Sequence, residues 1–128
     1  MGDALLGFGY MYQGTYARSR GVALEFRNDS QRCFVSCEGK TVYMDIILPC
    51  SGDTFCRVSV NQVLWFNGVR AVSQPASIED QLALLASELK RWCSAILSGD
   101  LSCPDARYCF KMSRKECDDY IAAQTGKE

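Results

Sequence analysis

The fold of this chain is decided by residues 32–48, which read RCFVSCEGKTVYMDIIL. In the second half of this stretch every other side chain is apolar, and a period of two places these side chains on one face of a β-strand. They are Val42, Met44, Ile46 and Leu48. The first half also has the period of a strand, and residues 38–40, Glu-Gly-Lys, form a short turn sequence between the halves. We therefore predict an antiparallel hairpin here.

Further strands are predicted on both sides of this hairpin, within residues 9–60. In the first upstream run Tyr10, Tyr12 and Tyr16 are predicted to share one face. Downstream, a shorter run covers residues 54–60. Such short connections favour antiparallel neighbours. The fold class that we predict is α+β, with an antiparallel meander of about four to six strands in the N-terminal half.

The C-terminal half is predicted to be helical. Ser77 can cap a helix whose apolar positions recur at spacings of three and four, and Gly99 follows its last turn. We expect this long amphipathic helix, near residues 78–98, to pack on the apolar face of the sheet. A second capping pattern predicts a short helix near residues 114–123. The segment 61–69 fits either a strand or a short helical turn.

Length and composition bound the class of protein. The chain has 128 residues, 48% of them hydrophobic and 23% charged, which is typical of a globular protein. No linker or repeat divides it, so residues 1–128 are predicted to form a single domain. Its uncharged stretches are far shorter than the roughly 20 apolar residues that cross a membrane, and the N-terminus lacks the pattern of a secretory signal. We therefore expect a cytoplasmic protein without a membrane partner.

Charge gives little indication of a polyanionic partner. Fourteen basic and fifteen acidic residues are interspersed along the chain. Nucleic-acid binding favours a basic face or stripe, so no nucleic-acid partner is predicted. One local basic cluster, Arg18 and Arg20 with Arg27 and Arg32, is interpreted as part of solvated strand edges.

The chain lacks the residue set of a recognisable enzyme. The absence of histidine excludes Ser-His-Asp, Cys-His and histidine-metal sites. Dinucleotide, phosphate-loop and calcium-loop motifs are absent from the sequence too. Two of the carboxylates at Glu25, Glu38 and Asp45 could form a catalytic pair, but alternation on a half-exposed sheet explains them better. The sequence therefore leans away from an enzyme.

Eight cysteines need an explanation. Their spacing lacks the Cys-x-x-Cys knuckles of structural zinc, so we predict no metal site and no cofactor. Free thiols are the expectation in a reducing cytosol. Cys103, Cys109 and Cys117 are the group best placed for a late crosslink or an exposed reactive thiol, and the sequence does not decide whether they form disulfides.

Aromatic residues are the strongest candidates for a binding surface. They are more numerous than one small core needs, and tyrosine with arginine is typical of binding hot spots. Aromatic side chains that fill the core or brace cross-strand pairs would explain them as well. The candidate binding residues are Tyr10, Tyr12, Tyr16, Tyr43 and Trp65, together with the acidic loop residues Asp29, Asp53 and Asp100.

The order of the predicted elements along the chain resembles that of a known group of proteins. It starts at Leu6-Gly-Phe-Gly, continues as a run of strands, and then has a helix that ends Ala95-Ile-Leu-Ser-Gly-Asp100. In this plan it resembles the small immunity proteins and orphan cassette proteins of bacterial polymorphic-toxin and mobile-gene neighbourhoods. The resemblance implies a protein that binds and blocks a cognate toxin. Interface residues differ between members of that group, so the resemblance assigns no functional residue, and the high cysteine content departs from the usual pattern.

Two hypotheses about function follow. The first is a non-enzymatic protein-binding module, an immunity protein that neutralises a cognate bacterial toxin through the exposed sheet face or the acidic loops. The alternative is a small-molecule-binding protein or an enzyme with a pocket between the sheet and the long helix, lined by Tyr10, Tyr12, Tyr43 and Trp65. A homodimer through the aromatic face is compatible with either hypothesis.

Overall fold

The computed structural model describes residues 2–100 and 109–127. These residues contain a six-stranded sheet in the order β1-β2-β3-β4-β5-β6, in which every neighbouring pair is antiparallel. The predicted α+β class and the antiparallel meander are therefore confirmed. The strands are β1 (Met11–Arg18), β2 (Gly21–Arg27), β3 (Arg32–Glu38), β4 (Thr41–Pro49), β5 (Phe55–Ser59) and β6 (Cys109–Met112).

The strand β6 lies outside the half of the chain in which strands were predicted. It follows the long helix in the sequence and returns to pair with β5 at one edge of the sheet. A strand of four residues has too short a pattern for its period to be recognised in the sequence. The pairing with β5 is therefore what defines this strand.

Within residues 2–100 and 109–127, five helical segments accompany the sheet: α1 (Gly2–Leu6), α2 (Val60–Phe66), the 3-10 helix η1 (Arg70–Ser73), α3 (Ile78–Leu97) and α4 (Arg114–Gln124). The predicted long and short helices are confirmed as α3 and α4. Ser77 caps α3 by accepting a hydrogen bond from the backbone N–H of Asp80, and Ser113 forms a capping box with Glu116 at the start of α4.

The remaining helices lie in segments for which the sequence predicted either two alternative elements or none. The segment 61–69 is mostly helical, because the side chain of Ser59 accepts a hydrogen bond from the backbone N–H of Gln62 and so caps α2. The short helix α1 lies in a region for which no element was predicted. None of the helices in the described part of the chain has the length and apolar character that a membrane crossing requires.

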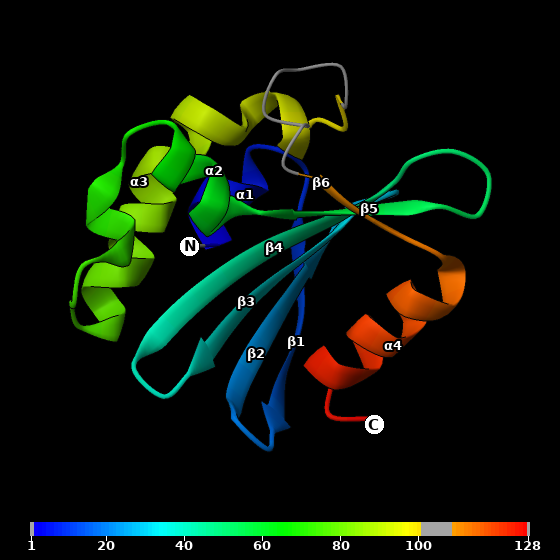
Figure 1. Cartoon of the computed structure of the whole chain (residues 1–128), viewed down its shortest axis with the longest axis horizontal. Helices are drawn as coiled ribbons and strands as arrows, with labels where there is room; N and C mark the ends of the chain where they lie inside the picture. Colours follow the sequence, from blue (N-terminus) through cyan, green and yellow to red (C-terminus); the bar gives the residue numbers. More distant parts are fainter. Residues whose placement is uncertain (1, 101–108, 128) are drawn as a thin grey trace.

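The elements form three layers with the sheet in the middle (Figure 1). The helices α1, α2 and α3 cover one face of the sheet, which we call the first face. The helix α4, close to the C-terminus, lies on the opposite, second face. Because one helix covers one face and three helices cover the other, the two faces are buried to different extents.

The main hydrophobic core lies on the first face. Its buried members are each at most 5% exposed, and burial of a large aliphatic side chain contributes about 1.5–3 kcal/mol. The sheet contributes the predicted residues Val42, Met44, Ile46 and Leu48 among others, and α3 contributes Leu85, Leu89, Cys93, Ile96 and Leu97. The predicted packing of the long helix on the apolar face of the hairpin is therefore confirmed.

A second, smaller core joins α4 to the second face. It consists of Phe34, Ile47, Met112 and Cys117, with Phe55, Tyr120 and Ile121 partly buried around it. These residues come from β3, β4, β5, β6 and α4. The second face is thus buried where α4 packs on it, and its buried side chains also include Ala23 of β2 and Ser36 of β3.

A β-bulge in β1 corrects one prediction about the tyrosines. Tyr12 pairs with Phe26 and Gly14 pairs with Glu25, so Gln13 is an extra residue without a partner in β2. One extra residue reverses the face on which all later side chains of a strand lie. Tyr12 therefore lies on the first face and Tyr16 on the second, and the prediction of a shared face for Tyr10, Tyr12 and Tyr16 is wrong.

The main core gives a first testable prediction. Leu89→Ala removes a fully buried side chain of α3 and should lower the free energy of unfolding by about 2–5 kcal/mol, because it leaves a cavity. Leu6→Ala, at a side chain that is 58% exposed, is the matched control and should change it by less than about 0.5 kcal/mol. Urea unfolding measures both, and equal effects of the two variants would contradict the position of α3.

Candidate functional site

A groove runs along α4 on the second face of the sheet. It consists of two clefts of about 390 and 430 Å³ that share the lining residues Arg27, Arg32, Asp118 and Ile121. We call this continuous depression the α4 groove. Phe55 and Arg114 line only the first cleft, whereas Tyr16 and Lys127 line only the second.

The position of α4 explains why the groove exists. One stripe of the helix, with Cys117 and Tyr120, packs on the second core. Near the end of the helix, the Oε1 atom of Gln124 accepts a hydrogen bond of 2.6 Å from Arg18 of β1. Residues 114, 118, 121 and 125 recur at spacings of three and four and so form a neighbouring stripe, which lines the groove. The same helix thus covers part of the second face and leaves an open depression beside Arg27 and Arg32, at the end of β2 and the start of β3.

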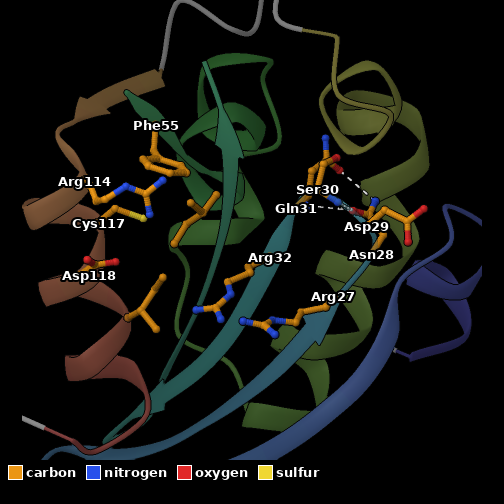
Figure 2. Close-up of a pocket in the computed structure, with 12 residues that line it drawn as sticks. Arg27, Asn28, Asp29, Ser30, Gln31, Arg32, Phe55, Arg114, Cys117 and Asp118 are labelled. Atoms are coloured by element: carbon orange, nitrogen blue, oxygen red, sulfur yellow. Dashed lines mark hydrogen bonds between the residues drawn. The ribbon is translucent and has the colours of Figure 1, made fainter. Parts of the chain in front are cut away.

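The floor of the groove is an ion cluster around one buried carboxylate. Arg27 of β2 and Arg32 of β3 are register partners, and Figure 2 shows both side chains in the cleft. The Nε atoms of the two arginines lie 2.9 and 3.3 Å from Oε2 of Glu25, whose side chain is 5% exposed. The hydroxyl of Tyr16 donates a hydrogen bond of 3.0 Å to the other oxygen of Glu25, and this bond raises the pKa of Tyr16.

The loop between β2 and β3 forms one rim of the groove. The side-chain oxygen of Asn28 accepts hydrogen bonds from the backbone N–H groups of Ser30 and Gln31, at 3.1 and 2.8 Å. This turn places Asp29 in the lining of the first cleft, as Figure 2 shows. Asp53 lies nearby, 3.6 Å from the guanidinium of Arg114.

The structure brings three of the eight predicted binding residues to this groove. Tyr16 and Asp29 line it, and Asp53 contacts the lining residue Arg114. Asp100 is exposed beyond the C-terminal end of α3, where its backbone N–H donates to the carbonyl of Ala95. The acidic loop residues therefore do not form a single cluster.

The other four predicted aromatic residues lie apart from one another. Tyr10 is 1% exposed in the main core, and its hydroxyl lies 2.5 Å from the side-chain amide of Gln31. Tyr12 is exposed and packs edge-on against Phe26. Tyr43 is exposed on β4, outside the lining of the groove, and Trp65 of α2 stacks with Arg70. Core filling and cross-strand bracing thus account for Tyr10 and Tyr12.

The predicted pocket between the sheet and α3 does not match the packing of the described residues. The space between them is filled by the main core, including the fully buried Met44 and Leu89. A cavity of about 10 Å³ near Val42 and Leu85 is no larger than one water molecule needs. Tyr10, Tyr12, Tyr43 and Trp65 therefore do not line a common pocket.

Sequence reasoning missed the arginines of the groove. Arg27 and Arg32 were interpreted as solvated strand edges, but their side chains are only 38% and 27% exposed. They flank the turn at residues 28–31, and a hairpin that pairs the residues on either side of this turn places them opposite each other. Their symmetric spacing about the turn is the feature of the sequence from which this pairing could have been predicted.

The three carboxylates from which a catalytic pair could have formed have separate partners. Glu25 interacts with the two arginines of the groove, and Glu38 pairs with Arg18. Asp45 accepts a hydrogen bond of 2.6 Å from the hydroxyl of Tyr120, which ties α4 to β4. Because Glu25 is 4% exposed, its interpretation as a surface residue is wrong.

The cysteines in the described part of the chain are free thiols. Burial raises the pKa of Cys33, Cys37, Cys56 and Cys117, which disfavours the nucleophilic thiolate. Cys109 and Cys117 belong to β6 and α4, while Cys103 lies outside the described residues. No group of three or more Cys, Asp or Glu side chains in the described ranges could hold a metal ion.

Comparison with protein-family models, curated proteins and solved structures found no significant match to this chain. The resemblance to immunity proteins therefore stays a prediction. The groove is consequently interpreted from its own chemistry.

The contact between Asp45 and Tyr120 gives a prediction about pH. Burial raises the pKa of Asp45 above its ordinary value of 3.8, although the hydrogen bond from Tyr120 and the charge of Arg57 oppose this shift. Folding therefore favours the protonated carboxyl, and this contribution to stability is lost as the pH rises through the folded-state pKa. Asp45→Asn cannot ionise at this position. Its free energy of unfolding, relative to that of the unchanged protein, should increase between about pH 4 and pH 7.

Urea unfolding of both proteins at the two pH values measures this difference. Asp119→Asn removes a carboxylate from the exposed side of α4 and controls for the general loss of one negative charge. A difference for Asp45→Asn that stays constant or decreases with pH would contradict the buried environment of Asp45.

Proposed function

We propose that this chain is a non-enzymatic protein-binding domain, an immunity protein that binds a cognate toxin in the α4 groove. The observation that carries the proposal is the groove itself, in which arginine, aromatic and aliphatic side chains from the sheet and α4 surround one open depression. The layout of the chain, which resembles immunity proteins, supports the same function.

The shape of the groove favours an extended segment of a protein. Pockets for small molecules usually enclose most of their ligand. The α4 groove instead joins two clefts along the length of α4, from Arg114 to Thr125 just beyond its end. At 1.5 Å per helical residue, this stretch of about 12 residues is about 18 Å long, which suits several residues of an extended chain.

The chemistry of the lining favours a protein interface. Arginine and tyrosine are enriched among the residues that contribute most to binding at such interfaces. The groove contains Arg27, Arg32, Arg114 and Tyr16, together with the apolar side chains of Phe55 and Ile121. A partner could therefore bury apolar side chains at one part of the groove and make charged contacts at another.

A non-enzymatic role agrees with the state of the potential catalytic groups. The buried thiols of Cys33 and Cys117 have raised pKa values, and a nucleophilic cysteine needs a lowered one. The carboxylate of Asp45 is engaged by Tyr120, which also holds α4 in place. These interactions are those of structural residues.

The homodimer considered from the sequence stays a prediction. The exposed aromatic residues Tyr12 and Tyr43 do not form one common face, because Tyr12 pairs with Phe26 on the first face of the sheet and Tyr43 pairs with Ser36 on the second. Sedimentation at two concentrations tests this state, because a chain that stays monomeric over the micromolar range has no functional homodimer.

Two neighbouring aspartates of α4 provide a matched test of the groove. Asp118 and Asp119 are both exposed, but only Asp118 lines the groove. Asp118→Trp should obstruct the groove and weaken partner binding by at least about tenfold, whereas Asp119→Trp should leave it nearly unchanged. The partner is first captured with the tagged chain from a lysate of the native source, and titration calorimetry then measures its affinity for each variant.

The immunity function adds a second readout. A captured partner that stops cell growth when expressed alone, and not when expressed with this chain, supports toxin neutralisation. Absence of a stoichiometric protein partner would contradict the protein-binding proposal, and equal affinities of the two tryptophan variants would place the interface elsewhere.

A further inference from the structure

The arrangement of Arg27 and Arg32 is unusual for an ordinary pair of neighbouring strands. They are direct register partners, and like charges in this position destabilise a sheet. Both nevertheless direct their guanidinium groups to the same place, the buried carboxylate of Glu25. The pair is therefore positioned by Glu25 and is not free to separate into solvent.

Glu25 balances only part of this charge. One carboxylate faces two guanidinium groups, and the additional partner of Glu25, the hydroxyl of Tyr16, is neutral when it donates its hydrogen bond. The short contact between Arg27 Nε and Glu25 Oε2 lacks the geometry of a hydrogen bond, and both atoms are buried without another hydrogen-bond partner in the described residues. The cluster therefore retains one excess positive charge and unused hydrogen-bonding capacity.

The unused donors belong mainly to the Nη atoms of the two arginines. Each guanidinium has five N–H donors, and in both arginines the Nε atom is the one whose distance to Glu25 identifies the ion pair. Within the described residues, the Nη atoms of Arg27 and Arg32 donate no hydrogen bond, and Glu25 is the ion-pair partner of both arginines. Figure 2 shows these groups in the cleft, where a bound segment could reach them.

The other charges of the groove limit which anion fits. Arg114 and Lys127 lie toward its two ends, while Asp29 and Asp118 add negative charge to the lining. The lining as a whole has four basic and three acidic side chains, so its positive charge is local to the arginine pair. Asp29 and Asp118 would repel a polyanion such as nucleic acid more strongly than a single carboxylate between uncharged neighbours, because the repulsion grows with the number of negative charges brought into the groove.

We infer that the Arg27–Arg32 pair is an anchor site for one carboxylate side chain, an aspartate or glutamate within an otherwise apolar or neutral segment of the protein partner. This inference rests on the proposed function, because it names the chemistry by which the same groove recognises its partner. The free Nη donors bind the two carboxylate oxygens, as arginine does in bidentate pairs. Glu25 and Tyr16 hold the two guanidinium groups in place before the partner binds, and the apolar side chains of Phe55 and Ile121 contact the residues on either side of the carboxylate.

Nuclear magnetic resonance on the isotope-labelled full chain tests the anchor without the natural partner. The probe is a blocked synthetic peptide with one glutamate flanked by leucines, and the matched peptide has glutamine in its place. The glutamate peptide should shift the Nε–Hε signals of Arg27 and Arg32 and bind at least about tenfold more tightly than the glutamine peptide. Its affinity should fall as the salt concentration is raised.

Variants assign the effect to the two arginines. Arg27→Gln and Arg32→Gln should each weaken binding of the glutamate peptide by at least about tenfold, whereas Arg20→Gln, in the exposed turn before β2, should not. Arg27→Lys and Arg32→Lys are included because they preserve the positive charge that compensates the buried Glu25. They should stay folded, as judged by the amide spectrum, and still bind less tightly because lysine lacks the bidentate fork.

The outcomes distinguish a failure of the anchor site from a failure of the proposed function. The inference is wrong if neither arginine signal shifts, if both peptides bind alike, or if the arginine variants bind the glutamate peptide as the unchanged protein does. Peptide binding with the expected dependence on the two arginines supports the anchor even where the lysate contains no protein partner, a result that contradicts the proposed function. A captured partner that binds Arg27→Gln and Arg32→Gln normally supports the proposed function and overturns the anchor.

Discussion

The structure depends on the burial of α3 against the first face of the sheet. This helix of 20 residues contributes five buried side chains, and together with α1 and α2 it covers the face that carries Met44 and Ile46. Hydrophobic burial on this scale is the main favourable term in folding. It also fills the space between α3 and the first face with the side chains of the main core, and the two clefts of the α4 groove lie on the opposite face.

The groove on the second face follows from the limited size of α4. Six strands at a spacing of about 4.8 Å make a sheet about 24 Å wide, whereas one helix is about 10–12 Å across. The 11 residues of α4 can therefore cover only part of that face. They cover Phe34, Ile47 and Met112, and the open part beside them, at the end of β2 and the start of β3, carries the charged side chains of Arg27 and Arg32.

Those charged side chains do more than keep the surface soluble. A carboxylate as buried as Glu25 is costly to place in a protein unless cationic groups compensate it, and Arg27 and Arg32 supply that compensation. The same compensation leaves the two guanidinium groups close together and directed into the groove. The same cluster thus stabilises the floor of the groove and, in our proposal, binds a carboxylate of the partner.

The sequence by itself determined the local elements. Alternation in residues 41–48 predicted β4, spacings of three and four predicted α3, and Ser77 and Ser113 marked the helix starts, because each signal depends on neighbours within a few residues. Only the tertiary structure decided which side chains meet. The bulge at Gln13 changes the face of Tyr16, the β2–β3 pairing brings two arginines to Glu25, and a hydrogen bond between residues 106 positions apart, Arg18 and Gln124, holds the end of α4. Such contacts depend on how distant segments pack, and a local pattern contains no information about a partner that lies far away in the chain.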